Sequence, residues 1–169
     1  MNATEKERQF INLLENHREQ VYRMCWGFAK QQQEVDDLFQ EVMIRLWKGL
    51  EKFEGRAQLS TWIYRITVNT CLYFKEKNKK VIWQPIDYKS DRSDFSNSET
   101  KIIHNERLQA LRAAIQQLSK ADKTIALLLL EELSYKEIAE VTGLTVNNVG
   151  VKIKRIKERI KKIMVNAKG

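Results

Sequence analysis

Amide and basic side chains gather near the C-terminal end of the sequence, in residues 145–162. Asn147 and Asn148 carry the amide groups that can pair with the edge of adenine. The Lys and Arg residues that follow them can neutralise the phosphates of a nucleic-acid backbone. Apolar residues recur between them every three or four positions, at Val149, Ile153, Ile156, Ile160 and Ile163. This spacing predicts a helix with one buried stripe and an opposite face suited to a polyanion.

The residues before this helix predict a shorter helix and a tight turn. Ser134 and Glu137 have the spacing of a capping box, in which each side chain satisfies a backbone N–H of the other. Gly143 suits a left-handed turn after a helix end, and Thr145 suits the N-cap of the next helix. The whole segment is typical of a DNA-binding helix-turn-helix. An ordinary helical hairpin with a solvated basic face is the simpler alternative, but the joint occurrence of these features favours DNA binding.

Composition predicts an all-α protein. Of the 169 residues 43% are hydrophobic, which is enough for a core, and six Gly and one Pro leave few helix breaks. The formal net charge is +8, and most of the excess lies in residues 101–169, which suits a polyanionic partner. Residues 83–100 lose helical periodicity and are rich in Ser and Asp. We therefore expect two small helical domains, residues 1–82 and 101–169, joined by a flexible linker.

The first domain should begin with two helices. Apolar spacing predicts a helix over residues 5–30 with an interruption near His17, a polar turn over residues 31–34, and a second helix that begins near Asp36. On a helical wheel, Ile44 falls in the middle of the second helix's polar face. The other residues of that face include Asp37, Gln40 and Glu41. An apolar side chain surrounded by charge suggests a partner surface, although a solvated face with one exposed Ile remains equally open.

A third helix should follow a loop over residues 53–60, in which Gly55 ends the preceding helix and Ser60 or Thr61 caps the next. This helix mixes aromatic and basic residues, a combination that binds single-stranded nucleic acid through base stacking and backbone charge. We assign Ile63 and Ile66 to the core and Trp62, with the loop before it, to this surface. In the second domain, a helix over residues 102–118 precedes a helix capped by Ser119.

The remaining reactive residue types predict no catalytic site. Cys25 and Cys71 lie in apolar helical patterns without a CxxC motif, as expected for buried thiols in a reducing compartment. There are two His residues, no glycine-rich phosphate loop and no nucleophile–base motif. We therefore expect no enzyme activity, no cofactor, no metal site and no small-molecule substrate. The N-terminus lacks an apolar signal segment and no run of 18 apolar residues occurs, so the expected location is the cytoplasm.

Taken together, the motifs resemble the extracytoplasmic-function (ECF) group of bacterial RNA polymerase sigma factors. Residues 36–55 and 59–74, DDLFQEVMIRLWKGLEKFEG and LSTWIYRITVNTCLYF, are similar to the family's second conserved region. Residues 115–160 are similar to its fourth region. The resemblance implies a factor that directs core polymerase to specific promoters and assists melting of the −10 element. A free-standing helix-turn-helix regulator, with an N-terminal sensing or dimerisation domain, is the alternative.

The resemblance also implies roles for individual residues. The residues implied to bind the β′ clamp of core RNA polymerase are Asp37, Leu38, Gln40 and Glu41, with Ile44 on the same surface. Those implied to bind −10 DNA are Arg56, Ser60, Trp62, Arg65 and Asn69. Those assigned to −35 DNA are Asn147, Asn148, Val151, Lys152, Lys154 and Arg155. The C-terminal domain would also sit on the β flap, and an anti-sigma factor is a further implied partner.

The sequence departs from the family pattern at Gly150, early in the recognition helix. Many members have Lys or Arg at this position. Glycine lowers helix propensity by about 1 kcal/mol and removes one DNA contact, so base reading should fall on the residues around it.

Overall fold

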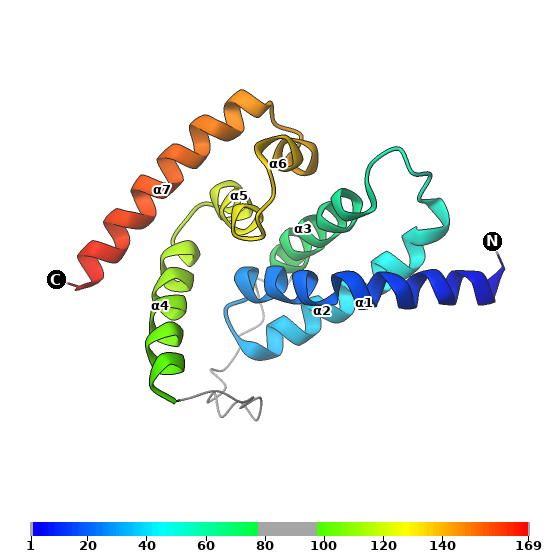
Figure 1. The fold of residues 1–169 in the computed structure, drawn as a ribbon, viewed down its shortest axis with the longest axis horizontal. Coiled ribbons are helices and arrows are strands. Elements are labelled where there is room, and N and C mark those ends of the chain that lie inside the picture. The colour runs from blue at the N-terminus through cyan, green and yellow to red at the C-terminus, as the bar shows by residue number, and fades with distance from the viewer. Residues whose placement is uncertain (1, 78–97, 169) are drawn as a thin grey trace.

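The computed structural model describes residues 2–77 and 98–168, and all regular structure in these two stretches is helical (Figure 1). The all-α prediction is therefore confirmed for the described residues. The helices are α1 (Ala3–Phe28), α2 (Gln32–Gly49), the short 3₁₀ helix η1 (Leu50–Lys52), α3 (Leu59–Lys77), α4 (Ser98–Gln116), α5 (Lys120–Leu130), α6 (Tyr135–Thr142) and α7 (Val146–Lys168). The predicted linker ends too late, because residues 98–100 already belong to α4; residues 83–97 lie outside the described residues.

The helices form two groups, α1–α3 and α4–α7, that pack against each other. Within the first group each helix contacts the other two, and in the second group α7 contacts α4, α5 and α6. Figure 1 shows α5 and α6 between α7 and the first group, where α1 contacts α4 and α5, and α3 contacts α6. One buried cluster runs from Leu13 in α1 to Ile156 in α7. The two groups therefore share a core in this arrangement.

Three local expectations in the first group are wrong. Helix α1 continues through His17, because no Gly or Pro interrupts it and its buried stripe resumes at Val21. Helix α2 begins at Gln32, since the buried Glu34 carboxylate accepts a hydrogen bond from the Lys30 N–H at 2.9 Å and stabilises the helix start. Helix α3 begins at Leu59, so Ser60 and Thr61 lie within its first turn and do not precede it.

Both cysteines are buried thiols that form no disulfide with each other, as expected. No group of three or more His, Cys, Asp or Glu residues that could hold a metal ion occurs within the described residues. None of the described helices is long and apolar enough to cross a membrane.

Candidate nucleic-acid interface

Three local features build the helix-turn-helix formed by α6 and α7. The Ser134 side chain accepts a hydrogen bond from the Glu137 N–H at 3.1 Å, and the Glu137 carboxylate accepts one from the Ser134 N–H at 3.0 Å. Helix α6 ends at Gly143, whose φ of 80° is left-handed. The Thr145 hydroxyl then accepts a hydrogen bond from the Asn148 N–H at 3.1 Å. The capping box, the glycine turn and the Thr145 N-cap are all confirmed.

Helix α7 has the predicted two faces. Val149, Ile153 and Ile156 are buried against the other helices of the second group, and Ile160 and Ile163 are half-buried. The outward side chains are exposed at Asn147, Asn148, Val151, Lys154 and Arg155, and half-buried at Lys152. The outward face therefore places amide, apolar and basic groups together on the first three turns of α7, as the second helix of a helix-turn-helix requires.

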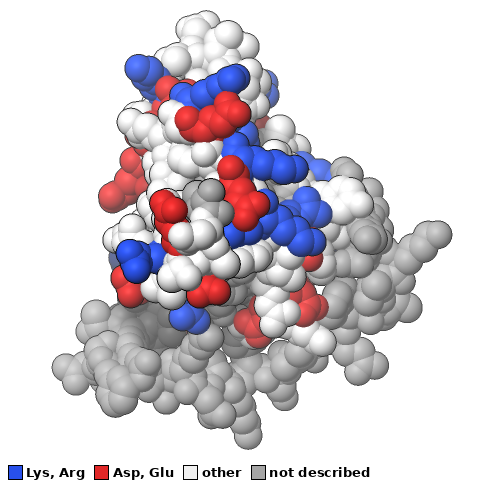
Figure 2. All heavy atoms as spheres, turned by 90° about the vertical axis from the view of Figure 1, so that its right-hand side faces the viewer, with Lys and Arg blue, Asp and Glu red and all other residues white. Residues whose placement is uncertain are grey.

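Charges of both signs are mixed on the side of the molecule that lies at the right of Figure 1. Figure 2 shows one side of the molecule, on which Lys and Arg side chains alternate with Asp and Glu. This side of the molecule, which does not include the outward face of α7, therefore has no single large basic field.

The loop before α3 and the start of that helix form a second candidate surface. Trp62 is half-buried, with its ring 5.0 Å from that of Phe53. A Cβ atom at Gly49 would lie 3.1 Å from the Trp62 ring, so the indole is held closely on two sides. Arg56 is 88% exposed and forms an ion pair with Glu54 at 3.0 Å. The indole is therefore fixed, while Arg56 is free of the core.

Of the three other predicted residues in α3, Arg65 and Asn69 are exposed. Ser60 is half-buried. One Arg65 Nη donates a hydrogen bond to the Glu140 carbonyl in α6 at 2.6 Å. This contact was not expected from the sequence, and it occupies part of the α3 surface with the helix-turn-helix.

The polar face of α2 forms a third candidate surface. Gln40 is exposed, Asp37 and Glu41 are half-buried, and Ile44 is 47% exposed, as predicted. The prediction that Leu38 contacts core polymerase is wrong, because Leu38 is only 1% exposed and packs in the core beneath this face. It can position α2 but cannot touch a partner directly.

Sequence reasoning missed one extension of the α2 face. The Arg45 guanidinium forms an ion pair with Glu41 at 3.1 Å and lies 5.2 Å from the centre of the Tyr73 ring in α3. Tyr73 is 52% exposed. Tyr73 therefore lies beside Arg45 at the edge of this surface, and only its unusual exposure distinguishes it from a core aromatic.

Polar contacts hold the two helix groups together. Arg23 in α1 donates two hydrogen bonds to the Glu131 carboxylate, at 2.7 and 2.8 Å, and this pairing raises the pKa of the Arg23 guanidinium. Burial raises the pKa of the nearby Tyr64 hydroxyl to about 12, and the negative charge of Glu131 adds to the shift.

The end of α1 is also capped by the second group. The Arg112 guanidinium donates to the Trp26 and Ala29 carbonyls at 3.1 and 2.7 Å, and the Gln116 amide donates to the Gly27 carbonyl at 2.7 Å. These carbonyls have lost their intrahelical partners at the helix end, so α4 satisfies them.

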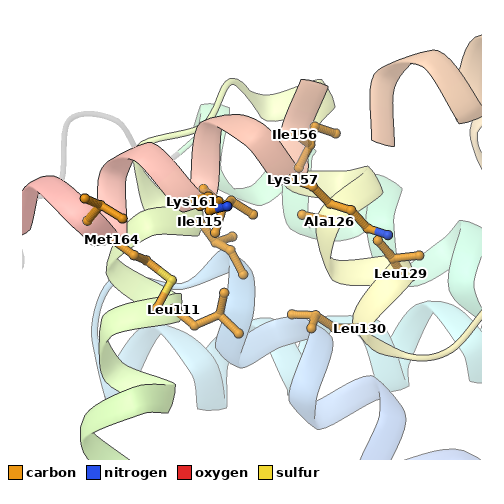
Figure 3. Close-up of a pocket in the computed structure, with 11 residues that line it drawn as sticks. Leu111, Ile115, Ala126, Leu129, Leu130, Ile156, Lys157, Lys161 and Met164 are labelled. Atoms are coloured by element: carbon orange, nitrogen blue, oxygen red, sulfur yellow. The ribbon is translucent and has the colours of Figure 1, made fainter. Parts of the chain in front are cut away.

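An apolar groove of about 430 Å³ lies between α4, α5 and α7. Figure 3 shows Leu111, Leu130 and Met164 extending into the space between these three helices. Lys157 and Lys161 also line it, both on α7. An apolar groove of this kind can bind the apolar face of an amphipathic helix.

Comparison with known proteins gives matches in both groups of helices. Residues 13–81 match the Sigma-70 region 2 family and residues 108–160 match the Sigma-70 region 4 family. The chain is 26% identical to the ECF RNA polymerase sigma factor SigG of Mycobacterium tuberculosis over 192 residues, which cover 98% of this chain and 51% of that protein. It is 24% identical to the ECF RNA polymerase sigma factor SigW of Bacillus subtilis over 163 residues, covering 90% and 87% of the two chains. The chain thus spans about half the length of SigG.

Two solved structures have the same fold. CnrH, solved in complex with the cytosolic domain of CnrY, has a TM-score of 0.69 at 20% identity, covering 96% of this chain and 91% of CnrH. The sigma factor RpoE of Bartonella quintana, solved in complex with the anti-sigma factor NepR, has a TM-score of 0.71 at 15% identity, covering 93% and 97%.

Proposed function

Because the chain belongs to the extracytoplasmic-function group of RNA polymerase sigma factors, we propose that it directs core polymerase to specific promoters and assists melting of the −10 element. The observation that carries this proposal is the pair of matches to regions 2 and 4, one on each helix group. A free-standing regulator would need only the helix-turn-helix, so it leaves the match over residues 13–81 without a role.

We assign polymerase binding to the α2 face. Asp37, Gln40 and Glu41 supply polar and acidic groups, and Ile44 supplies an exposed apolar anchor among them. An apolar centre with a polar rim is the usual arrangement of a protein interface. In this proposal the face binds the β′ clamp, while Leu38 holds α2 in place from the core.

We assign the −10 element to the loop before α3 and to the exposed side of that helix. A base that has left the duplex loses stacking, and a fixed aromatic ring beside basic groups can replace part of it. Trp62 supplies the ring, and Arg56 and Arg65 supply positive charge, with Ser60 and Asn69 as hydrogen-bonding groups. Arg65 must first leave the Glu140 carbonyl, so binding of the melted strand requires α3 and α6 to separate.

We assign the −35 element to the outward face of α7. Asn147 and Asn148 are positioned to read base edges at the start of the helix, and Lys152, Lys154 and Arg155 to contact phosphates. Val151 lies among them and is exposed.

We also propose an anti-sigma factor as a partner, because RpoE was solved with the anti-sigma factor NepR and CnrH with the cytosolic domain of CnrY. The apolar groove between α4, α5 and α7 would receive one of its helices, and the second helix group would also contact the β flap. In this function the chain has no catalysis of its own and needs no cofactor, metal or small-molecule substrate. It acts in the cytoplasm, where polymerase and promoter DNA are found.

The test is transcription in vitro with core polymerase and a library of genomic fragments, with and without the protein. New start sites should appear only when it is present. Asp37→Arg combined with Glu41→Arg should abolish both binding to core polymerase and these start sites. Glu7→Arg combined with Glu15→Arg changes the net charge equally on an exposed part of α1 and should preserve both. Full polymerase binding by the first double variant would contradict the proposal.

A further inference from the structure

Gly150 is the glycine whose presence the fold does not explain. Five glycines lie within the described residues. Gly55 and Gly143 have φ angles of 75° and 80°, which side-chain-bearing residues rarely adopt. A Cβ at Gly27 would overlap the side chain of Leu127, and one at Gly49 would crowd the ring of Trp62. At each of these four positions a side chain would strain the backbone or crowd a neighbour.

Position 150 has room for a side chain. It lies inside α7, where glycine is among the poorest helix-forming residues. A Cβ there would come no closer than 3.7 Å to the nearest atoms, which belong to the Tyr135 ring, and this is ordinary van der Waals contact. An alanine would thus fit and improve the helix. The contacts within the described residues therefore do not explain the glycine.

The residues around Gly150 suggest a reason for the glycine. Asn147 and Lys154 are its neighbours on the helix surface, three and four residues away, and both belong to the proposed −35 surface. Three apolar side chains around it are unusually exposed: Tyr135 at 42%, Val146 at 49% and Val151 at 55%. Exposed apolar groups cannot pair with phosphates, so they suit the part of this face that reads bases.

We propose that Gly150 allows α7 to lie unusually deep in the major groove, where Val151 contacts the methyl group of a thymine in the −35 element. This inference rests on the proposed function. In the major groove the thymine methyl is the apolar group that marks its base pair, and apolar side chains read it by direct contact. Valine is short, so its methyl groups reach the base only if the helix backbone comes close. Glycine at the neighbouring position adds no side chain to this part of the helix surface, so the backbone can approach the DNA more closely.

The first experiment removes the methyl group from the DNA. Promoter duplexes found by the transcription assay are prepared with each −35 thymine replaced in turn by deoxyuridine, which keeps the hydrogen-bonding pattern. Binding by polymerase carrying the full chain is measured at one salt concentration. Replacement at one position should weaken binding about fourfold, the value of one buried methyl group.

The second experiment removes the partner side chain. Val151→Ser should bind the thymine and deoxyuridine duplexes equally at that position, so the fourfold difference disappears. Val165→Ser makes the same change at a 61% exposed position near the other end of α7 and should leave the thymine-to-deoxyuridine ratio unchanged. The inference would be overturned if Val151→Ser still bound the thymine duplex more tightly than the deoxyuridine duplex. It would also be overturned if the wild-type protein bound the two duplexes equally at every position.

The third experiment separates stability from binding. Gly150→Ala should raise the midpoint of thermal unfolding by about 1–4 °C, because it improves the helix. The same variant should weaken promoter binding about fivefold or more, the value of one lost base contact. Unchanged promoter binding by this variant would contradict the close approach. If wild-type holoenzyme showed no −35-dependent binding at all, the proposed function would fail, whereas binding without any deoxyuridine effect would refute only this inference.

Discussion

The contact between Arg23 and Glu131 gives the sharpest prediction, because it joins the two helix groups. The pair has two hydrogen bonds of 2.7 and 2.8 Å, and the Glu131 side chain is only 8% exposed. The Arg23 side chain is 54% exposed, so solvent screens its part of the interaction. Charge-assisted hydrogen bonds contribute about 1.5–3 kcal/mol, and after screening we expect about 1–2 kcal/mol for the pair.

This magnitude can be measured by a double-mutant cycle. Arg23→Gln, Glu131→Gln and the combined variant should show a coupling of about 1–2 kcal/mol in the free energy of unfolding. Glu19→Gln is the matched control, since Glu19 also lies near Arg23, at 3.9 Å, but its side chain is 92% exposed. Glu19→Gln should cause no measurable change in the free energy of unfolding.

The same substitutions should alter DNA binding. The packed arrangement occupies Arg65 with the Glu140 carbonyl, so only molecules with separated groups can present the whole α3 surface. Weakening the packing by about 1–2 kcal/mol should raise the population of separated molecules, and the affinity of the free chain for single-stranded −10 DNA, by up to about 5–30-fold. Small-angle scattering should show the accompanying expansion. A coupling below about 0.3 kcal/mol, or a full coupling with unchanged scattering and DNA affinity, would refute this reasoning.

Three further predictions follow from single residues. Lys154→Ala should weaken binding to all DNA sequences alike and reduce the slope of log K against log salt by about one; a loss confined to one sequence would point instead to base reading. Ser134→Ala should lower the free energy of unfolding by about 0.5–2 kcal/mol in denaturant titration, whereas no loss would mean that the capping box contributes little. The raised pKa of Tyr64, about 12 against 10.0, means that its stabilising effect is complete below pH 10 and is lost as pH rises toward 12. Tyr64→Phe should remove the part of the alkaline decline in melting temperature that comes from ionisation of Tyr64. An identical decline in both proteins would exclude a contribution from Tyr64.

The sequence alone determined the features that depend on neighbouring residues. Caps such as Ser134 with Glu137 act over one helical turn, and apolar spacing identifies the buried side of α7 whatever it packs against. These signals predicted the all-α class, the helix-turn-helix and the exposed position of Ile44. They failed where periodicity is a poor guide, as at His17 and at the start of α2, because a helix can continue through a polar turn when later residues are buried.

Only the tertiary structure decided how distant elements meet. Arg23 and Glu131 are 108 residues apart, and Arg65 and Glu140 are 75 apart, so no local pattern relates them. The burial of Leu38 beneath a surface that its neighbours share also depends on how α1 and α3 pack on α2. The sequence likewise marked Gly150 as unusual, but only the packing around it showed that a side chain would fit. Helix faces are specified by residues three or four apart, whereas the contacts between faces are specified by the whole core.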